Sequence, residues 1–229
     1  MKTYKAKSVR QFLKRVIELD RKWRDRRGRR VELWFRGQQD KAVPQPSLYR
    51  GAFRPRTTDA ESRIEFERRG VQFSHDRIIA GRWGRYFLMQ HFGLPTRLLD
   101  WTYGALIALY FAARKTVVDG RAPSTAVIWA IDPLSLNKLA LGWRAIALPN
   151  WKAVKPWLPK DPYGAIRPRY PVAIDPVHVD PRLAAQRSHF TLFGNDGNGL
   201  KKLARRKAKK LRLARIAITG RERIERIVA

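Results

Sequence analysis

The sequence contains no cysteine, and this absence removes several classes of chemistry at once. Disulfide bonds, thiolate nucleophiles and cysteine-ligated zinc sites are all excluded. The sequence also lacks a glycine-rich phosphate loop of the Rossmann or P-loop type, and a paired-carboxylate motif of the kind a metal-dependent nuclease uses. We therefore expect no bound metal, and we rank a metal-dependent nuclease last. Histidine is scarce as well, and no two of its positions have a metal-binding spacing: His75, His91, His178 and His189.

Long apolar runs are missing too. The longest, Ala105 to Ala113, is far too short to span a bilayer. The first residues are basic and lead into an amphipathic segment, so we predict no signal peptide. Hydrophobic residues still make up 44% of the 229 residues, which is enough to bury a core. We expect a cytoplasmic protein, with association with the nucleoid as an extension of that expectation.

Acidic residues are few, and this imbalance is the main feature of the composition. The chain holds 49 Lys and Arg against 19 Asp and Glu, for a net charge of +30. Residues 1–30 hold 13 basic and 3 acidic side chains, and residues 201–229 hold 12 and 2. Because such an excess repels itself unless an anionic partner offsets it, we predict a polyanionic partner, with nucleic acid favoured.

The basic segment near the C-terminus has the pattern of an amphipathic helix. Leu200, Leu203, Ala204 and Leu211 form a thin apolar stripe over residues 200–211. The stripe has no Trp or Phe, so we favour nucleic acid over an anionic membrane surface as the partner. For the basic face of the first predicted helix, a merely solvated face is the alternative. The candidate nucleic-acid contacts are Lys201, Lys202, Arg205, Arg206, Lys209 and Lys210.

Tryptophan offers a second route to nucleic acid, because an exposed indole can stack on bases. Three tryptophans in a proline-rich segment are the candidates for stacking: Trp143, Trp151 and Trp157. Three others lie in apolar runs and are predicted to be core residues: Trp34, Trp101 and Trp129.

The order of predicted elements indicates an α+β fold. Prolines from Pro149 to Pro181 preclude long regular elements, so we expect an irregular layer over 143–181. We predict one mixed domain with a small central sheet and flanking helices, a core over about 31–193, and basic helical extensions at 1–30 and 200–229. The predicted helices are 8–23, 61–73, 82–92, 103–116, 134–141 and 200–211, and the predicted strands are 31–35, 96–101, 125–131, 172–174, 189–193 and 216–218.

The densest polar cluster falls among residues that otherwise look like core. It consists of Gln90, His91, Thr96, Arg97 and Asp100. Burying Arg and Asp is costly unless they pair or bind a ligand. One interpretation is structural, with an Arg97–Asp100 ion pair at the turn and Asp100 capping the following helix. The other is a ligand site, in which His91 is either structural or a general base.

These motifs together resemble the FRG domain family, which is named for a Phe-Arg-Gly signature. The resemblance rests on Phe35-Arg36-Gly37-Gln38, on Pro46-Ser47-Leu48 with Arg50, on the Gln90–Thr102 run, and on Ala105-Leu106-x-Ala108-Leu109-x-Phe111-Ala112. Arg182, Gln186 and Phe190-Thr191 are similar to the last polar motif of the family. Ser188 departs from the pattern, since the family often has Gly there.

The resemblance implies a protein of bacteria or their phages, in a toxin or phage-defence setting, whose motif order is similar to that of ADP-ribosyltransferase-like folds. NAD would be the substrate. Arg36 would hold the pyrophosphate, Gly37 would let the backbone approach closely, and Gln186 would take the late polar role. Since Gln186 is not a carboxylate, a base would have to be His91 or Asp100. The implied cofactor-binding residues are Gly37, Gln38, Thr96, Arg97 and Asp100, and the catalytic ones are Arg36, Gln186 and His91. A non-catalytic nucleic-acid-binding protein is the alternative function.

Overall fold

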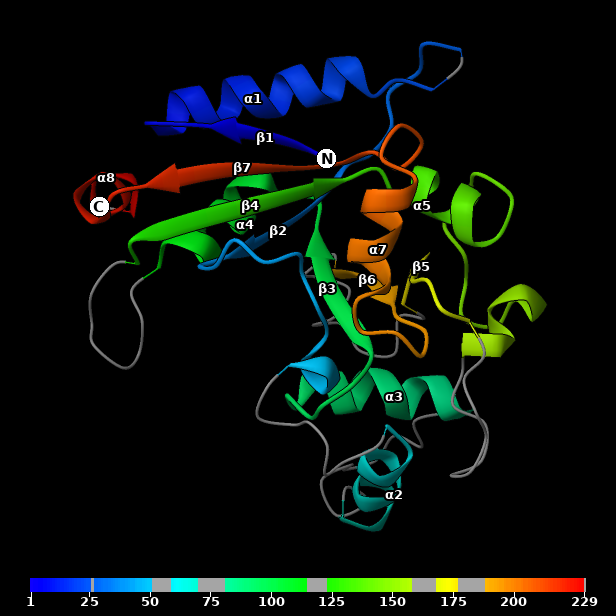
Figure 1. Cartoon of the computed structure of the whole chain (residues 1–229). Coiled ribbons are helices and arrows are strands. Elements are labelled where there is room, and N and C mark those ends of the chain that lie inside the picture. Colours follow the sequence, from blue (N-terminus) through cyan, green and yellow to red (C-terminus); the bar gives the residue numbers. More distant parts are fainter. Residues whose placement is uncertain are drawn as a thin grey trace.

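The computed structural model describes residues 1–25, 27–50, 59–69, 81–114, 123–157, 168–176 and 188–228. The strands described there form one mixed sheet in the order β1-β7-β4-β2-β3-β6-β5 (Figure 1). β1 runs parallel to β7, and the other neighbours are antiparallel. The strands are β1 (Lys2–Lys5), β2 (Trp34–Gln38), β3 (Leu98–Thr102), β4 (Thr125–Ile131), β5 (Val172–Ile174), β6 (Ser188–Leu192) and β7 (Leu213–Thr219).

Helices flank the sheet, and several begin or end where the sequence predicts. Ser8 accepts a hydrogen bond from the Gln11 N–H and begins the first helix, and Gly93, with a φ of 74°, follows α3. The helices are α1 (Val9–Lys22), α2 (Asp59–Arg69), α3 (Gly81–His91), α4 (Ala105–Ala113), α5 (Pro133–Ala140), α7 (Gly199–Arg206) and α8 (Arg221–Val228), with 3-10 turns η1 (Ser47–Tyr49) and η4 (Lys152–Trp157). In the described part of the chain, no helix is both long and apolar enough for a bilayer.

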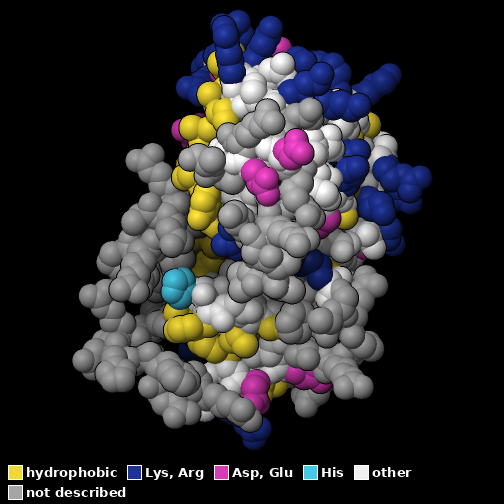
Figure 2. Space-filling view, turned by 90° about the vertical axis from the view of Figure 1, so that its left-hand side faces the viewer, with side chains coloured by type: hydrophobic (Ala, Val, Ile, Leu, Met, Phe, Trp, Pro, Cys, Tyr) yellow, Lys and Arg dark blue, Asp and Glu magenta, His cyan; other side chains and the backbone are white. Residues whose placement is uncertain are grey.

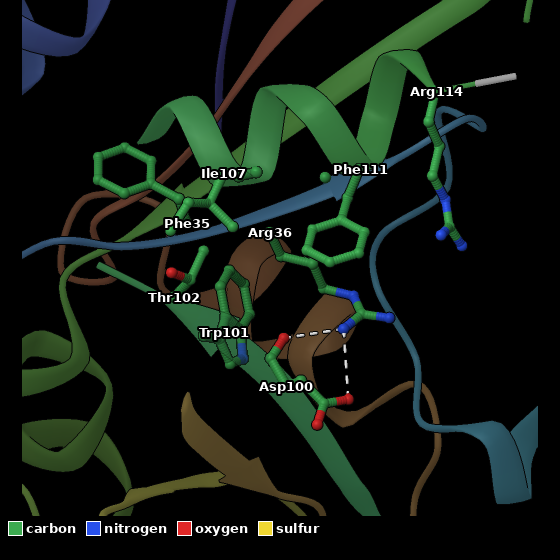
Figure 3. A pocket seen from close by; sticks show the side chains of 10 residues that line it. Phe35, Arg36, Asp100, Trp101, Thr102, Ile107, Phe111 and Arg114 are labelled. Carbon is green, nitrogen blue, oxygen red and sulfur yellow. Dashed lines mark hydrogen bonds and ion pairs between the residues drawn. The ribbon is translucent and has the colours of Figure 1, made fainter. Parts of the chain in front are cut away.

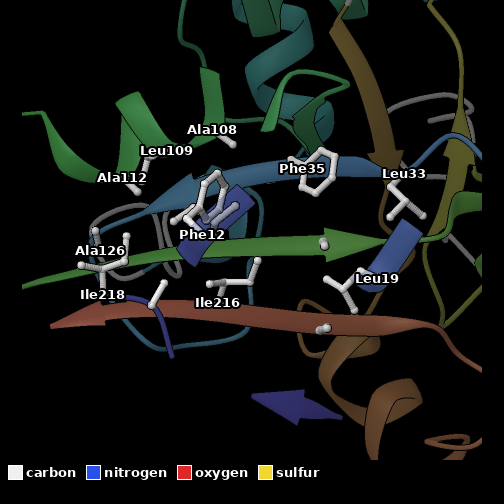
Figure 4. Close-up of a cluster of buried hydrophobic side chains, with 14 of the residues drawn as sticks. Phe12, Leu19, Leu33, Phe35, Ala108, Leu109, Ala112, Ala126, Ile216 and Ile218 are labelled. Carbon is white, nitrogen blue, oxygen red and sulfur yellow. The ribbon is translucent and has the colours of Figure 1, made fainter. Parts of the chain in front are cut away.

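The main hydrophobic cluster lies between the sheet and the helices α1, α4 and α8 (Figure 4). Phe12 and Leu19 of α1 are fully buried there, and each contributes about 1.5–3 kcal/mol through the area removed from water. Ile128 of β4 joins this cluster, whereas its neighbours Val127 and Trp129 face the opposite side of the sheet. On that opposite side the cluster includes residues of α5 and α7.

The sheet is nearly divided where β2 meets β3. β2 pairs with β4 along its whole length, from Trp34 to Gln38, but with β3 only through Phe35 and Thr102. Beyond that pair the two strands diverge. One arm of the sheet therefore contains β1, β7, β4 and β2, and the other contains β3, β6 and β5, which pack against α3 in a third apolar cluster. The fork between the arms is the position of the site described below.

The basic ends of the chain, which we expected to be helical extensions, contribute two strands to the sheet. β1 is an edge strand beside β7, and β7 lies between β1 and β4. In β1 only Tyr4 is half-buried against the core, so the segment lacks the apolar alternation from which a strand is predicted. The lysines of β1 are typical of an exposed edge strand. The sheet thus extends beyond the core predicted for 31–193.

Three predicted boundaries shift because tertiary pairing decides them. The strand predicted at 31–35 begins at Trp34, which pairs with the last residue of β4, and continues to Gln38. The helix predicted to reach residue 211 ends at Arg206, although Leu211 is still buried after a turn. The strand predicted at 216–218 spans Leu213–Thr219, because it pairs with the whole of β4.

Candidate functional site

A pocket of about 700 Å³ lies in the fork between β2 and β3, under α4 (Figure 3). It brings together Arg36, Gly37 and Asp100, three residues that the sequence predicted for a site. Since Arg36 and Asp100 are 64 positions apart, the fold alone creates this neighbourhood. The pocket is lined by Phe35, Arg36, Gly37, Asp100, Trp101, Thr102, Ile107, Ala108, Phe111 and Arg114.

Arg36 is the central cation of this pocket. One terminal nitrogen of its guanidinium donates to the backbone oxygen of Asp100 at 2.8 Å and lies 3.7 Å from that residue's carboxylate. The side chain is only 20% exposed, and its buried Nε–H has no acceptor among the described residues. Burial lowers the pKa of Arg36 and the charge of Asp100 opposes that shift, yet an arginine stays protonated. The site therefore holds a fixed positive charge with unused donors.

Asp100 is held by a chain of side-chain hydrogen bonds that starts in α3. Gln90 Nε2 donates to Asp100 Oδ2 at 2.8 Å, and the Thr96 hydroxyl donates to Gln90 Oε1. Thr96 is fully buried, and its backbone N–H donates to the Ser47 hydroxyl at 3.3 Å. Thr96 therefore supports the pocket through Gln90 and does not line it.

Arg97 is buried in the body of the protein. Its Nε donates to Asp59 at 3.1 Å, and its two terminal nitrogens donate to the backbone oxygens of Phe193 and Trp157, each at 2.6 Å. Tyr86 donates to the same Asp59 carboxylate and accepts from the Arg97 backbone N–H. Burial opposes the charged form of Arg97, but these partners raise its pKa, and burial beside Asp59 raises the pKa of Tyr86 well above 10. The group joins five separate segments of the fold.

The predicted ion pair between Arg97 and Asp100 does not form. Residues three apart on an extended chain point to opposite sides, so each finds its own partner. Asp100 does not cap the next helix either, because the residue before α4 is Gly104 and no side chain caps it.

Gly37 admits the close approach of a helix. A Cβ placed on Gly37 would lie 1.8 Å from the backbone oxygen of Ala108 and 2.8 Å from the backbone nitrogen of Ala112. The glycine therefore lets α4 lie directly on β2. Gln38, the next residue, donates to Asp40 Oδ1 at 2.9 Å and to the Ala42 oxygen at 2.6 Å, which orders the loop after β2.

Of the two remaining residues predicted to be catalytic, His91 is not among the described residues that line the pocket. His91 is exposed at the end of α3, where its ring contacts Phe92. Gln186 lies outside the described residues, so its role stays a prediction.

The tryptophan predictions have a mixed outcome. Trp34, Trp101 and Trp129 are buried, as predicted. Trp157 is wrong as a stacking candidate, since it is buried and its Nε1 donates to the Tyr170 oxygen at 2.8 Å. The other two candidates are exposed, Trp143 by 41% and Trp151 by 36%.

The six predicted nucleic-acid contacts are all exposed, on α7 and the turn that follows it. Their apolar neighbours Leu200, Leu203 and Ala204 are buried against the sheet, which directs the cations outward. Lys202 is engaged locally, by an ion pair to Asp196 at 2.6 Å.

Ile107, Phe111 and Arg114 line the pocket but were not among the predicted site residues. Ile107 and Phe111 of α4 are about half exposed, and the Arg114 guanidinium lies 5.3 Å from the centre of the Phe111 ring. The exposure of Ile107 and Phe111 could have been expected from the sequence, because α4 is apolar on every side. A helix lying on a sheet buries only one side, so some of its apolar residues must face a ligand, a partner or water.

The fold and the site define a mixed α/β protein with one seven-stranded sheet and an arginine-centred pocket at its fork. Residues 31–119 match the family model of the FRG domain. This match confirms the resemblance to the FRG domain that the motifs predicted, and every described residue that lines the pocket falls within the matched segment. No curated protein and no solved structure matches the chain.

Proposed function

We propose that this protein is an ADP-ribosyltransferase-like enzyme that binds NAD in the pocket at the β2–β3 fork. The observation that carries the proposal is Arg36, a cation with unused donors that is fixed at the edge of a half-apolar pocket. The order of motifs, with Arg36 on an early core strand and Asp100 on the next, supports it. The enzyme would act on or near nucleic acid, as a toxin or phage-defence effector.

The pocket has the properties that a dinucleotide needs. Its volume of about 700 Å³ falls in the range usual for small-molecule sites. Phe111 and Ile107 offer an apolar wall for a planar ring, and the Arg36 guanidinium matches the oxygens of a phosphate. A bound anion would also offset part of the cost of burying the unpaired Arg36 Nε–H.

The chemistry assigns a task to Asp100. In ADP-ribosyl transfer, the bond between nicotinamide and the ribose carbon breaks, and its electron pair leaves with nicotinamide. An oxygen or nitrogen of the acceptor bonds to the same carbon and loses a proton. Asp100 lines the pocket and its side chain is 48% exposed, so its carboxylate can take that proton, whereas His91 is outside the lining. Gln186 keeps its proposed role of orienting the ribose or the acceptor.

The test of this proposal is the variant Arg36→Ala. We expect NAD consumption to fall by about 100-fold or more, because the variant removes the fixed charge that positions the diphosphate. Nicotinamide release would be measured with and without DNA or RNA, together with the mass of ADP-ribose on any macromolecule. Arg10→Gln, which removes an exposed charge from α1, is the control and should keep full activity. Equal turnover in Arg36→Ala and the unchanged protein would contradict the proposal.

A second candidate is a non-catalytic nucleic-acid-binding protein. It is favoured by the exposed cations of α7 and its following turn, and by the Lys and Arg side chains that gather at the top of the molecule, over α1, and along one edge (Figure 2). Such a surface binds phosphates without reading sequence. In this case the arginine pocket would contribute nothing to the function.

The second candidate predicts a strong effect of Arg205→Gln with Arg206→Gln. We expect weaker binding to duplex DNA or to RNA, and a slope of log K against log salt that is smaller by up to about two units. Lys152→Gln with Lys155→Gln is the matched control, because it removes two exposed charges from η4. Fluorescence anisotropy at several salt concentrations measures both. Equal losses in the two double variants would indicate that only net charge matters.

A further inference from the structure

A second, polar pocket adjoins the first and shares Arg36 with it. Its volume is about 470 Å³, and it lies between the end of β2, the loop after β2, η1 and the residue before α7. Two amide side chains in its wall are fixed by each other, since Gln45 Nε2 donates to Asn198 Oδ1 at 2.9 Å. Its lining consists of Arg36, Gln38, Asp40, Ala42, Val43, Pro44, Gln45, Tyr49, Arg50 and Asn198.

This polar pocket contains two arginines whose charges act on each other. Burial is the main cause that lowers the pKa of Arg36, and the charge of Arg50 lowers it further. The Arg50 side chain is exposed and forms no hydrogen bond or ion pair with any residue that the structure describes, whereas its backbone N–H donates to the Ser47 oxygen at 3.0 Å. Asp40, the one carboxylate in the lining, already accepts from Gln38 and from the Ala42 N–H through the same oxygen. Two neighbouring cations in one recess repel each other, and an anion bound between them would add to the offset that Asp100 and Asp40 already give Arg36.

We propose that the polar pocket is a diphosphate subsite, in which Arg36 and Arg50 together bind the two phosphates of a nucleotide ligand. The planar ring of that ligand lies in the first pocket, against Phe111. The naming of the ligand as a nucleotide rests on the proposed function, whereas the diphosphate subsite rests on the two arginines.

The arrangement suits a diphosphate better than a single phosphate. Arg36 lines both pockets and so can contact the phosphate nearer the ring, while Arg50 lines only the polar pocket and can reach the farther one. Each planar guanidinium can donate two parallel hydrogen bonds to phosphate oxygens. Because Gln38 and the Gln45–Asn198 pair already fix the surrounding loop, little order has to be imposed on binding.

The experiment is a calorimetric titration of the full chain with inorganic pyrophosphate. We expect Arg50→Gln to weaken binding by about tenfold or more, because a charge-assisted hydrogen bond is lost. Arg36→Ala should weaken it at least as much. Arg10→Gln, an equal loss of charge outside both pockets, should leave it unchanged. Arg114→Gln, in the first pocket only, should have a smaller effect than Arg50→Gln.

Two results would overturn the subsite. One is an Arg50→Gln variant that binds pyrophosphate as tightly as Arg10→Gln does, and the other is a larger loss in Arg114→Gln. Nicotinamide release from NAD by the same variants separates the two proposals. If turnover of NAD depends on Arg36 but not on Arg50, and pyrophosphate binding does not depend on Arg50 either, the subsite is contradicted and the proposed enzyme activity is supported. If pyrophosphate binding depends on Arg50 but no variant and not even the unchanged protein turns over NAD, the subsite is supported and the proposed enzyme activity is contradicted.

Discussion

Replacing Arg97 with alanine is expected to remove most of the stability of the protein. The change would leave the buried Asp59 carboxylate without its cation and the backbone oxygens of Phe193 and Trp157 without their donor. Removing one partner of a buried ion pair costs about 3–5 kcal/mol. That is comparable with the whole free energy of unfolding of a small domain. Urea unfolding followed by circular dichroism would measure the loss.

The matched comparison for this prediction is Arg36→Ala. Arg36 is also an arginine of a sequence motif, but its side chain is only partly buried and its hydrogen bond is to a single backbone oxygen, so the fold should persist. The resemblance implied a ligand-binding role for both residues, whereas the residue pattern left a structural role for Arg97 open. If Arg97→Ala unfolds at the same urea concentration as the unchanged protein and instead loses ligand binding, the motif arginine is a ligand residue and the structural role is wrong.

The second large effect is expected from Gly37→Ala. The new methyl group would overlap the backbone oxygen of Ala108, and a helix backbone cannot give way as a flexible side chain can. Overpacking of this kind costs about 1–3 kcal/mol, occasionally more, and here α4 must move away from β2 as a unit. We expect a loss at or above that range, or a protein that does not fold. Thermal unfolding provides the measurement.

Gly142→Ala is the control for this variant. Gly142 has a φ of 89°, and a Cβ at this position would have no neighbouring atom within 4 Å, so alanine meets backbone strain alone, of about 1–2 kcal/mol. A Gly37→Ala protein that is no less stable than Gly142→Ala would mean that β2 and α4 have room between them. The glycine of the Phe-Arg-Gly motif would then have to be explained by the ligand.

Local signals in the sequence were enough for much of the fold. Ser8 with Phe12 and Leu19 predicted α1, and the strands Thr125–Ile131 and Val172–Ile174 were predicted at their observed bounds. The secondary structure of these segments follows from local features of the sequence, namely a helix-capping residue and the periodicity of the apolar residues. Strand β1 has one half-buried apolar residue and is a strand only because β7 pairs with it.

The candidate site was predictable in its residues but not in their roles. The Phe-Arg-Gly motif and the run from Gln90 to Thr102 identified Arg36 and Asp100. Which polar residue meets which depends on contacts between distant segments, as with Arg97 and Asp59, 38 positions apart. The exposure of Phe111 could have been inferred from the sequence, because its helix is entirely apolar. The fork between β2 and β3, which forms the pocket beside Phe111, could not have been inferred.

The position of β7 between β1 and β4 also has a consequence for biosynthesis. Thr3 and Arg215 are register partners in the parallel pair, 212 positions apart. On the ribosome, β1 and α1 are made long before β7, so the cluster around Phe12 lacks Ile216 and Ile218 until β7 has been made. Contacts so distant in sequence slow folding and leave apolar surface open to aggregation in the meantime.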